Sequence, residues 1–416
     1  MTYKVLLFGT GLGDNYGCDA IVLGTEQILR HRFPDCEVWL PHNTWREPQY
    51  EAILGTTNGI TILAGKMARA AHLCRRVLEK VGLWAPRVLS VPTRAVTRCD
   101  CVLSIGGDLY TFSDKEENWP FPYPIVEAGN EIVRLGKPYI IWCASVGPLE
   151  KAGDRLGELV EHLRKCRAII VREQDSYLYL RENLGLTHNV YLASDPAFVM
   201  EAEPFDFPLL NSRSSDKILA VNFSMGPLEH VYGHLPMAQF QSSLVLFVRK
   251  LLNKIPIRLL FVPHVRTDYE LLYGIMDNIG ETSSKRIHIL PKKIGARKTK
   301  WAVSRANALV AMRFHCSLAG FSTITPTMIL LSTAKGVKIC KEMYGNMNYG
   351  VNIRDMDEDW VIPRIRELLD NEEMIRAGLA TKCEEMKTRA LGAGEILSRV
   401  LGASSVGETT AMTGER

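Results

Sequence analysis

Apolar runs of strand length recur along the chain, and six of them end abruptly in glycine or in charged and polar residues. Segments with helical periodicity lie between the runs, which is the alternation typical of parallel sheets with helical crossovers. Sheets of this kind bind ligands at the carboxyl ends of their strands. We therefore expect the polar residues after these runs to line one cleft. The runs are residues 101–105, 139–144, 168–171, 190–194, 259–262 and 308–312.

The alternation occurs in two series, separated by a proline- and serine-rich stretch, residues 201–216, that has no clear period. We predict an α/β fold with two Rossmann-like domains, each built on a mainly parallel sheet, and a cleft between them. The N-terminal domain is expected to span residues 1–200 and the C-terminal domain residues 217–402. The small, polar residues 403–416 are expected to form a disordered tail.

Composition narrows the class of protein. The chain has 416 residues, 46% of them hydrophobic, which is enough for two cores, and no apolar stretch approaches the length of a membrane span. A net charge of +4 from 50 basic and 46 acidic residues is too balanced to indicate nucleic-acid binding. The N-terminus reads as a first strand rather than a signal peptide, and the ten cysteines lack zinc-like spacing. We expect a cytoplasmic protein.

A basic segment with helical periodicity, residues 66–81, lies in the N-terminal half of the chain. Such a run of charge is usually a solvated helix face. The same pattern also favours peripheral association with the inner face of a membrane.

The run at residues 308–312 ends in Arg313, Phe314 and His315. In an extended chain, side chains two residues apart point the same way, so Arg313 and His315 are expected to leave the strand end together. A guanidinium beside a titratable imidazole suits an anionic ligand. The alternative is a surface arginine and a packed histidine that merely close a strand.

Other polar residues at strand ends have two interpretations each. Arg172 stands just before a helical segment, where its guanidinium and free backbone amides would form an anion site; alternatively, it pairs with Glu173 or Asp175. His264 follows a proline and either contacts phosphate or packs in a turn. Asp195, before a proline, is expected to be a turn or cap residue near the hinge.

The first strand-like run is followed by a glycine-rich turn, residues 9–17 (GTGLGDNYG). It begins like a dinucleotide-binding loop, but Asp14 stands where the fingerprint has its third glycine. An anion or sugar can still bind here, or the turn serves helix packing alone. Asn15 within it either hydrogen-bonds a ligand or locks its own loop.

Several short blocks match a known family when they are taken together and in order. They are residues 15–21 (NYGCDAI), 104–108 (SIGGD), 145–148 (SVGP), 171–176 (VREQDS), 194–198 (SDPAF) and 313–315 (RFH). In this order they resemble the polysaccharide pyruvyl transferase family, whose opening reads NxGDxA(I/L). The chain departs from the family at Cys18, which lengthens that opening by one residue, and in a C-terminal pattern only partly kept around Lys335.

The resemblance implies two Rossmann-like domains arranged as in GT-B glycosyltransferases, with the acceptor on the N-terminal side and the donor on the C-terminal side. It also implies phosphoenolpyruvate as the donor substrate, a reaction without a metal or other cofactor, and a sugar or lipid-linked oligosaccharide as the acceptor. The acceptor sugar is not fixed by the resemblance.

The candidate residues suit this chemistry. Phosphoenolpyruvate carries a carboxylate and a phosphate, which guanidinium groups bind bidentately, so Arg172 and Arg313 are assigned to anion binding. His315 is the candidate general acid for the enol carbon. Asp108 is expected either to take the proton of the acceptor hydroxyl or to orient that hydroxyl. Lys335 is a further substrate-binding candidate, by its match to the family.

Two other functions remain open at this point. A GT-B glycosyltransferase with a nucleotide-sugar donor would use the same architecture and a similar basic cleft. Alternatively, the cleft binds a phosphorylated metabolite without catalysis and signals to a partner.

Overall fold

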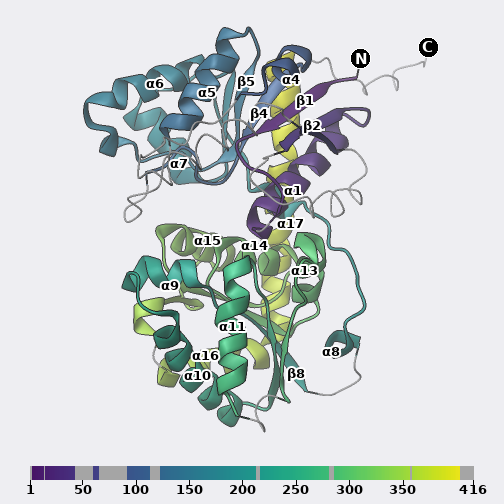
Figure 1. The fold of residues 1–416 in the computed structure, drawn as a ribbon, viewed down its shortest axis with the longest axis vertical. Helices are drawn as coiled ribbons and strands as arrows, with labels where there is room; N and C mark the ends of the chain where they lie inside the picture. Colours follow the sequence, from purple (N-terminus) through teal and green to yellow (C-terminus); the bar gives the residue numbers. More distant parts are fainter. Residues whose placement is uncertain are drawn as a thin grey trace, which may run out of the picture.

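The protein is described by a computed structural model at residues 2–13, 15–42, 60–64, 91–112, 122–211, 216–280, 285–356 and 358–402. The basic segment, Asp14 and the tail at residues 403–416 lie outside the described residues, so the expectations for them stay predictions. Two α/β units follow one another along the chain (Figure 1). None of the described helices is long and apolar enough to cross a membrane.

Within the described residues, the first sheet has seven strands, all parallel. The strands are β1 (Lys4–Phe8), β2 (Glu37–His42), β3 (Ile60–Ala64), β4 (Cys101–Ile105), β5 (Tyr139–Ala144), β6 (Ala168–Val171) and β7 (Val190–Leu192). Their order in the sheet is β3-β2-β1-β4-β5-β6-β7. The helices and helical turns of this part are α1 (Tyr16–Arg32), α4 (Thr93–Arg98), α5 (Tyr123–Arg134), η2 (Glu150–Arg155), α6 (Leu156–Lys165), α7 (Gln174–Leu178), η3 (Tyr179–Asn183) and η4 (Pro196–Phe198).

Side chains along β1 point alternately into two apolar cores, one on each face of the sheet. Leu7 packs in the same apolar cluster as residues of α1, whereas Leu6 packs with residues of α4, α5 and α6. Successive side chains of a strand point to opposite faces, so each face of the sheet requires its own layer of helices. The buried runs that predicted the strands are a consequence of this covering on both faces.

The second sheet has six strands in the described part of the chain, also all parallel. They are β8 (Lys217–Asn222), β9 (Ile257–Phe261), β10 (Ile287–Ile289), β11 (Ala308–Ala311), β12 (Thr327–Leu331) and β13 (Gly350–Asn352), in the order β10-β9-β8-β11-β12-β13. The helices and helical turns are α8 (Pro208–Asn211), α9 (Met225–Tyr232), α10 (Met237–Lys254), α11 (Arg266–Asn278), α13 (Gly295–Ser304), α14 (Phe314–Ser322), α15 (Ala334–Tyr344), η5 (Ile353–Asp355), α16 (Glu358–Asp370) and α17 (Glu372–Leu401).

The expected fold class is confirmed, because both sheets are parallel and helices cover them. The predicted strand at residues 308–312 is one residue shorter, since β11 ends at Ala311. The stretch expected to be a linker is not entirely irregular: it contains the short helix α8, whose Leu209 and Leu210 pack in an apolar cluster with residues of the second sheet.

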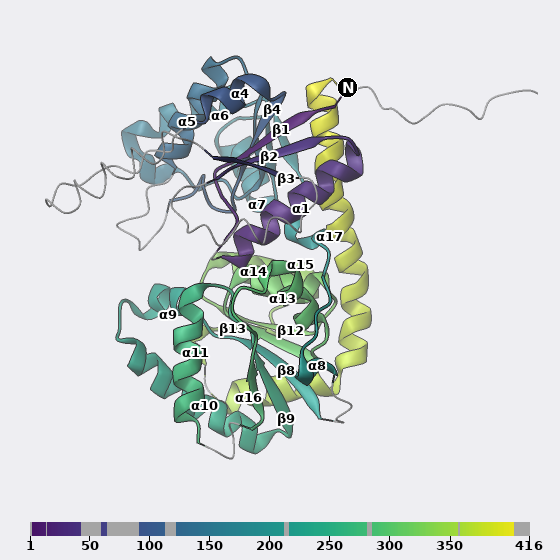
Figure 2. The ribbon, with the colours of Figure 1, turned by 45° about the vertical axis from the view of Figure 1, so that its right-hand side comes forward.

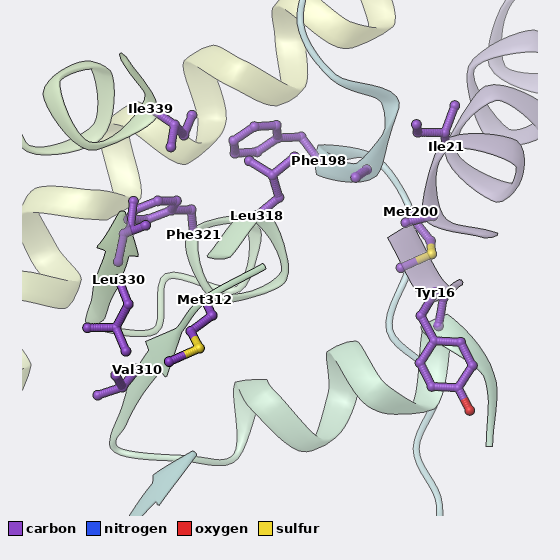
Figure 3. Packing of buried hydrophobic residues seen from close by; sticks show 14 of the residues in the cluster. Tyr16, Ile21, Phe198, Met200, Val310, Met312, Leu318, Phe321, Leu330 and Ile339 are labelled. Carbon is purple, nitrogen blue, oxygen red and sulfur yellow. The ribbon is translucent and has the colours of Figure 1, made fainter. Parts of the chain in front are cut away.

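Two features join the domains. The 30-residue helix α17 runs along both of them (Figure 2), with Arg376 bonded to the Ala306 carbonyl at one end and Glu395 to Arg32 at the other. In addition, one apolar cluster extends across the boundary. Figure 3 shows Ile21 and Met200 from the N-terminal side in this cluster together with Leu318 of α14.

Candidate active site at the domain boundary

The residues after the predicted strand ends meet where the two domains face one another. In the second sheet β8, β9, β11 and β12 are each followed by a helix, so the N-termini of α9, α11, α14 and α15 lie at one edge (Figure 1). Helix N-termini carry partial positive charge and unpaired amide groups, which favours anions. The edge of the first sheet lies opposite, and side chains from the two edges interact directly.

Arg172 follows β6, and its side chain is buried with every nitrogen engaged within the protein. Nη1 donates to Asp195 Oδ2 at 2.6 Å, and Nε and Nη2 donate to Ser145 Oγ at 3.2 and 3.0 Å. Nη2 also reaches the Gly107 carbonyl at 3.2 Å and Asp108 Oδ1 at 3.3 Å. The ion pair suggested with Glu173 or Asp175 is therefore formed with other carboxylates.

Gly107 makes room for this guanidinium, since a Cβ at that position would lie 2.9 Å from Arg172 Nη1. The glycine in the SIGGD block is thus explained by close packing against an arginine 65 residues later.

Asp195 has more contacts than the turn or cap role expected from the sequence. It does cap η4, as expected of a turn residue, because Oδ1 accepts a hydrogen bond from the Ala197 amide at 2.9 Å. Its other oxygen, however, faces both Arg172 and His315 Nε2, the latter at 3.5 Å. Burial opposes ionisation of this carboxyl, but Arg172 and His315 outweigh it and hold the pKa of Asp195 well below its ordinary value.

Asp108 and Lys335 form an ion pair across the domain boundary. Lys335 lies in the first turn of α15, and Asp108 follows β4. Burial opposes ionisation of Asp108, yet Lys335 and Arg172 together lower its pKa. A carboxylate with a lowered pKa is a weak base and a good hydrogen-bond acceptor. The geometry therefore suits orientation of a hydroxyl better than removal of its proton.

Arg313 and His315 do not leave a strand together, so that prediction was wrong. The strand ends at Ala311, Arg313 is the N-cap of α14, and His315 lies in the first turn of the helix. A helix turns its residues about 100° apart, and the two side chains diverge. Arg313 faces Asp268, whereas His315 faces Asp195.

Arg313 is held at one side only. Nε is buried and lies 3.4 Å from Asp268 Oδ2, but it makes no hydrogen bond to any described residue. The two terminal nitrogens likewise donate no hydrogen bond within the described part of the chain. Asp268 is fully buried and links the segments that follow β8 and β9. It accepts hydrogen bonds from Ser224 Oγ at 2.6 Å and from the amides of His264 and Val265 at 2.9 and 3.1 Å.

His264 is buried, and neither of its ring nitrogens has a hydrogen-bond partner among the described residues. Burial and the nearby Arg313 and His315 lower the pKa of His264 to about 3, so the ring is neutral. It therefore has one donor and one acceptor to offer a ligand. The ring lines a small pocket at the boundary, with Tyr16, Ala20, Ala197, Met200, Ala296, Lys300, His315 and Ala319.

Asn15 is the N-cap of α1, and its side-chain oxygen accepts a hydrogen bond from the Gly17 amide at 3.0 Å. The backbone of the following Tyr16 donates to the His264 carbonyl at 3.0 Å, so this loop also contacts the second domain. In this structure the side chain locks its own turn, which was one of the two alternatives.

Lys300 is a boundary residue that the sequence did not single out. It is buried in α13 and donates to the carbonyls of Ala197, Phe198 and Met200 at 3.1, 3.5 and 2.5 Å. Burial and Lys387 lower its pKa to about 7. No local signal marks it, because a lysine on an amphipathic helix is ordinarily solvated.

The fold and the site define a class: a two-domain α/β protein of the GT-B type in which charged side chains from both domains meet at the strand ends. The UDP-N-acetylglucosamine 2-epimerase from Neisseria meningitidis bound to UDP-GlcNAc has a TM-score of 0.56 and 10% identity, over 96% of this chain and 99% of that chain. Staphylococcus aureus MnaA with UDP has a TM-score of 0.58 and 11% identity, over 97% of this chain and 98% of that chain. UGT71G1 from Medicago truncatula with UDP-glucose has a TM-score of 0.55 and 10% identity, over 96% of this chain and 98% of that chain. At such identities the likeness is one of fold alone.

The sequence itself matches the family model of the polysaccharide pyruvyl transferases over residues 15–332. The chain belongs to this family. It is accordingly a transferase of the family that acts in pyruvyl transfer to polysaccharides, and the resemblance seen in its short blocks is confirmed. No curated protein matches the sequence.

Proposed function

We propose that this protein transfers the pyruvyl group of phosphoenolpyruvate to two hydroxyls of a sugar in a glycan or glycan precursor, forming a ketal and releasing phosphate. One observation supports the donor more than any other. At the strand ends of the second sheet, two side chains lie beside converging helix N-termini: Arg313, whose buried Nε has no hydrogen-bond partner among the described residues, and His264, whose neutral imidazole has none either. Buried polar groups without partners are costly, so this arrangement favours an anionic ligand that pairs with them.

Phosphoenolpyruvate fits this edge by its charge and by its size. Arg313 presents its two terminal nitrogens as a fork, which matches the two oxygens of a carboxylate or a phosphate. His264 supplies a neutral hydrogen bond nearby, and the amides at the start of α14 are available to a second anionic group. The donor is thus assigned to the second domain.

His315 is placed to supply the proton. In the proposed reaction it protonates the methylene carbon of the donor, and the carbon that bears the phosphate becomes oxocarbenium-like and is attacked by the first sugar hydroxyl. Phosphate then leaves with its electron pair, and the second hydroxyl closes the ketal. Of the two hydroxyl protons, one replaces the proton given by His315 and the other leaves with phosphate. The reaction uses no cofactor other than its donor substrate.

The edge of the first sheet is assigned to the acceptor. Asp108 is about half exposed, and its pKa is lowered by Lys335 and Arg172 against the effect of burial. It would accept a hydrogen bond from a sugar hydroxyl and orient it. Arg172, by contrast, has no free nitrogen for a ligand in this arrangement and is assigned to holding Asp195 and Asp108 in place.

The test is phosphate release from phosphoenolpyruvate by the purified full chain with a panel of sugar acceptors, together with mass spectrometry of the products. We expect acceptor-dependent release and a product heavier by pyruvate less water. Release should be strongly reduced in Arg313→Ala and His315→Ala, and kept in the exposed control variants Arg305→Ala and His188→Ala. If no acceptor supports release and only nucleotide sugars protect the protein against heating, the proposal is wrong and the chain is a nucleotide-sugar transferase.

A further inference from the structure

Asp195 lies between two functional candidates that come from different domains. Its Oδ2 is 2.6 Å from Arg172 Nη1 on the N-terminal side and 3.5 Å from His315 Nε2 on the C-terminal side. Its side chain is only 4% exposed. A buried carboxylate that faces one imidazole nitrogen keeps that nitrogen protonated and stabilises the charged ring.

The ring of His315 is fixed by its surroundings. On one side it packs against Gly17, where an added Cβ would lie 2.7 Å from Nδ1. On the other side Nε2 is buried and points to Asp195, without a hydrogen bond of normal length. A slight approach of the two domains would shorten 3.5 Å to a hydrogen bond, as is common when a substrate closes an active site.

The local role of Asp195 does not explain this contact. Capping of η4 uses Oδ1 alone, and an asparagine would cap equally well. Arg172 has a second carboxylate in Asp108 at 3.3 Å. The orientation of Oδ2 toward His315 is an additional feature, and it depends on a residue of the opposite domain.

We propose that Asp195 is the positioning residue for His315: it holds a proton on Nε2, so that the proton given to the donor is the one on Nδ1, and it stabilises the doubly protonated ring. Because Asp195 and His315 belong to different domains, the acid is prepared for proton transfer only when the domains are in this arrangement. The inference rests on the proposed function for the role of His315, but the pairing itself can be measured without any substrate.

Other ionisable groups also face His315, and they bear on its titration. The group is of mixed sign, and the carboxylate closest to the ring is that of Asp195. The members are Asp195, Asp108, His264 and Lys300, whereas Arg313 on the same helix faces Asp268.

The first experiment compares the pH dependence of kcat in the wild type and in Asp195→Asn, which keeps the cap and removes the charge. If His315 acts as an acid, activity falls as pH rises through its titration. Loss of a nearby negative charge makes the ring lose its proton more readily, so the alkaline limb should move to lower pH. KM for the donor should change little. An unchanged limb would overturn the proposal.

A double-variant test separates positioning from structure. If Asp195 acts through His315, Asp195→Asn should lower kcat substantially when it is introduced into the wild-type protein. When it is introduced into His315→Ala, it should lower kcat little further. Multiplicative losses in the double variant would show that the two residues act independently. Arg172→Lys, which keeps a cation beside Asp195, should leave the alkaline limb in place.

The second experiment follows the His315 ring by NMR in the substrate-free full chain, with His315→Ala to assign its signal. In Asp195→Asn the titration should move in the same direction, to lower pH. Gly17→Ala, whose Cβ displaces the ring, should do the same if Asp195→Asn does not fold. A titration unchanged in a folded variant rejects the pairing. A wild type that shows the pairing but releases no phosphate from phosphoenolpyruvate instead rejects the proposed function.

Discussion

The two sheet edges that face each other use their arginines differently. At the first edge, Arg172 is buried and all its nitrogens are bonded to Asp195, Asp108, Ser145 and Gly107. At the second, Arg313 has one carboxylate beside Nε and no partner for its terminal nitrogens among the described residues. Both arginines follow an apolar strand. The comparison shows that the carboxylates around an arginine, rather than its place after a strand, determine whether it is free to bind an anion.

The largest expected effect is on stability, at the first edge. Arg172→Met should lower the free energy of unfolding by about 3–5 kcal/mol, because Asp195 would keep a buried carboxylate without its cation. Urea denaturation followed by circular dichroism measures this change. Arg305→Met, at an exposed position, is the control and should lie within about 0.5 kcal/mol of the wild type. If the urea midpoints of Arg172→Met and of the control were equal, Arg172 would not be a structural residue, and the two arginines would not differ in role.

The second effect is on catalysis, at the opposite edge. Arg313→Ala should reduce kcat/KM for phosphoenolpyruvate roughly 10²–10³-fold, as expected for loss of a charged group at the reacting phosphate. The fold should be kept, because Asp268 retains its bonds to Ser224 and to two amides. Steady-state phosphate release measures the loss, and Arg313→Lys should recover only part of it because lysine lacks the fork. Full activity in Arg313→Ala would place the donor elsewhere.

The third effect is a pH dependence of stability that belongs to His264. Its pKa is about 3 in the folded protein, owing to burial and its cationic neighbours, against 6.5 ordinarily. Between these values the unfolded chain binds more protons, so the free energy of unfolding should fall as pH drops below 6.5, by at most about 1.4 kcal/mol per unit. His264→Gln should flatten this slope, whereas the exposed His188→Gln should not. Denaturation series from pH 7 to about 4 decide the matter.

The smallest effect concerns the ion pair that joins the edges. Lys335→Gln breaks the partly exposed pair with Asp108 and should cost less than about 1 kcal/mol of stability. It should nevertheless raise KM for the acceptor, because Asp108 loses its orientation. Lys338→Gln is the matched control on the same helix, since Lys338 pairs with Asp175 at 2.7 Å. The contrast fails if both variants raise KM for the acceptor equally.

Much of the site could be located from the sequence, but its internal pairing could not. Strand-length apolar runs placed Asp108, Arg172 and His264 at strand ends, where the structure has them. The direction of His315 was mistaken because two residues after β11 the chain already turns into α14. No local pattern distinguishes a strand that continues from one that gives way to a helix at that point.

By itself the sequence determined the class of fold, the alternation of strands and helices, and the family, because apolar periodicity and short motifs are local properties of the chain. Only the tertiary structure decided which charges meet. Lys335 reaches Asp108 across 227 residues, and Asp195 meets both Arg172 and His315. Such pairs depend on how two separately built sheets are set against each other, by the apolar boundary and by α17. Burial then makes each pairing consequential, since a buried charge needs a partner and a group left without one is available to a ligand.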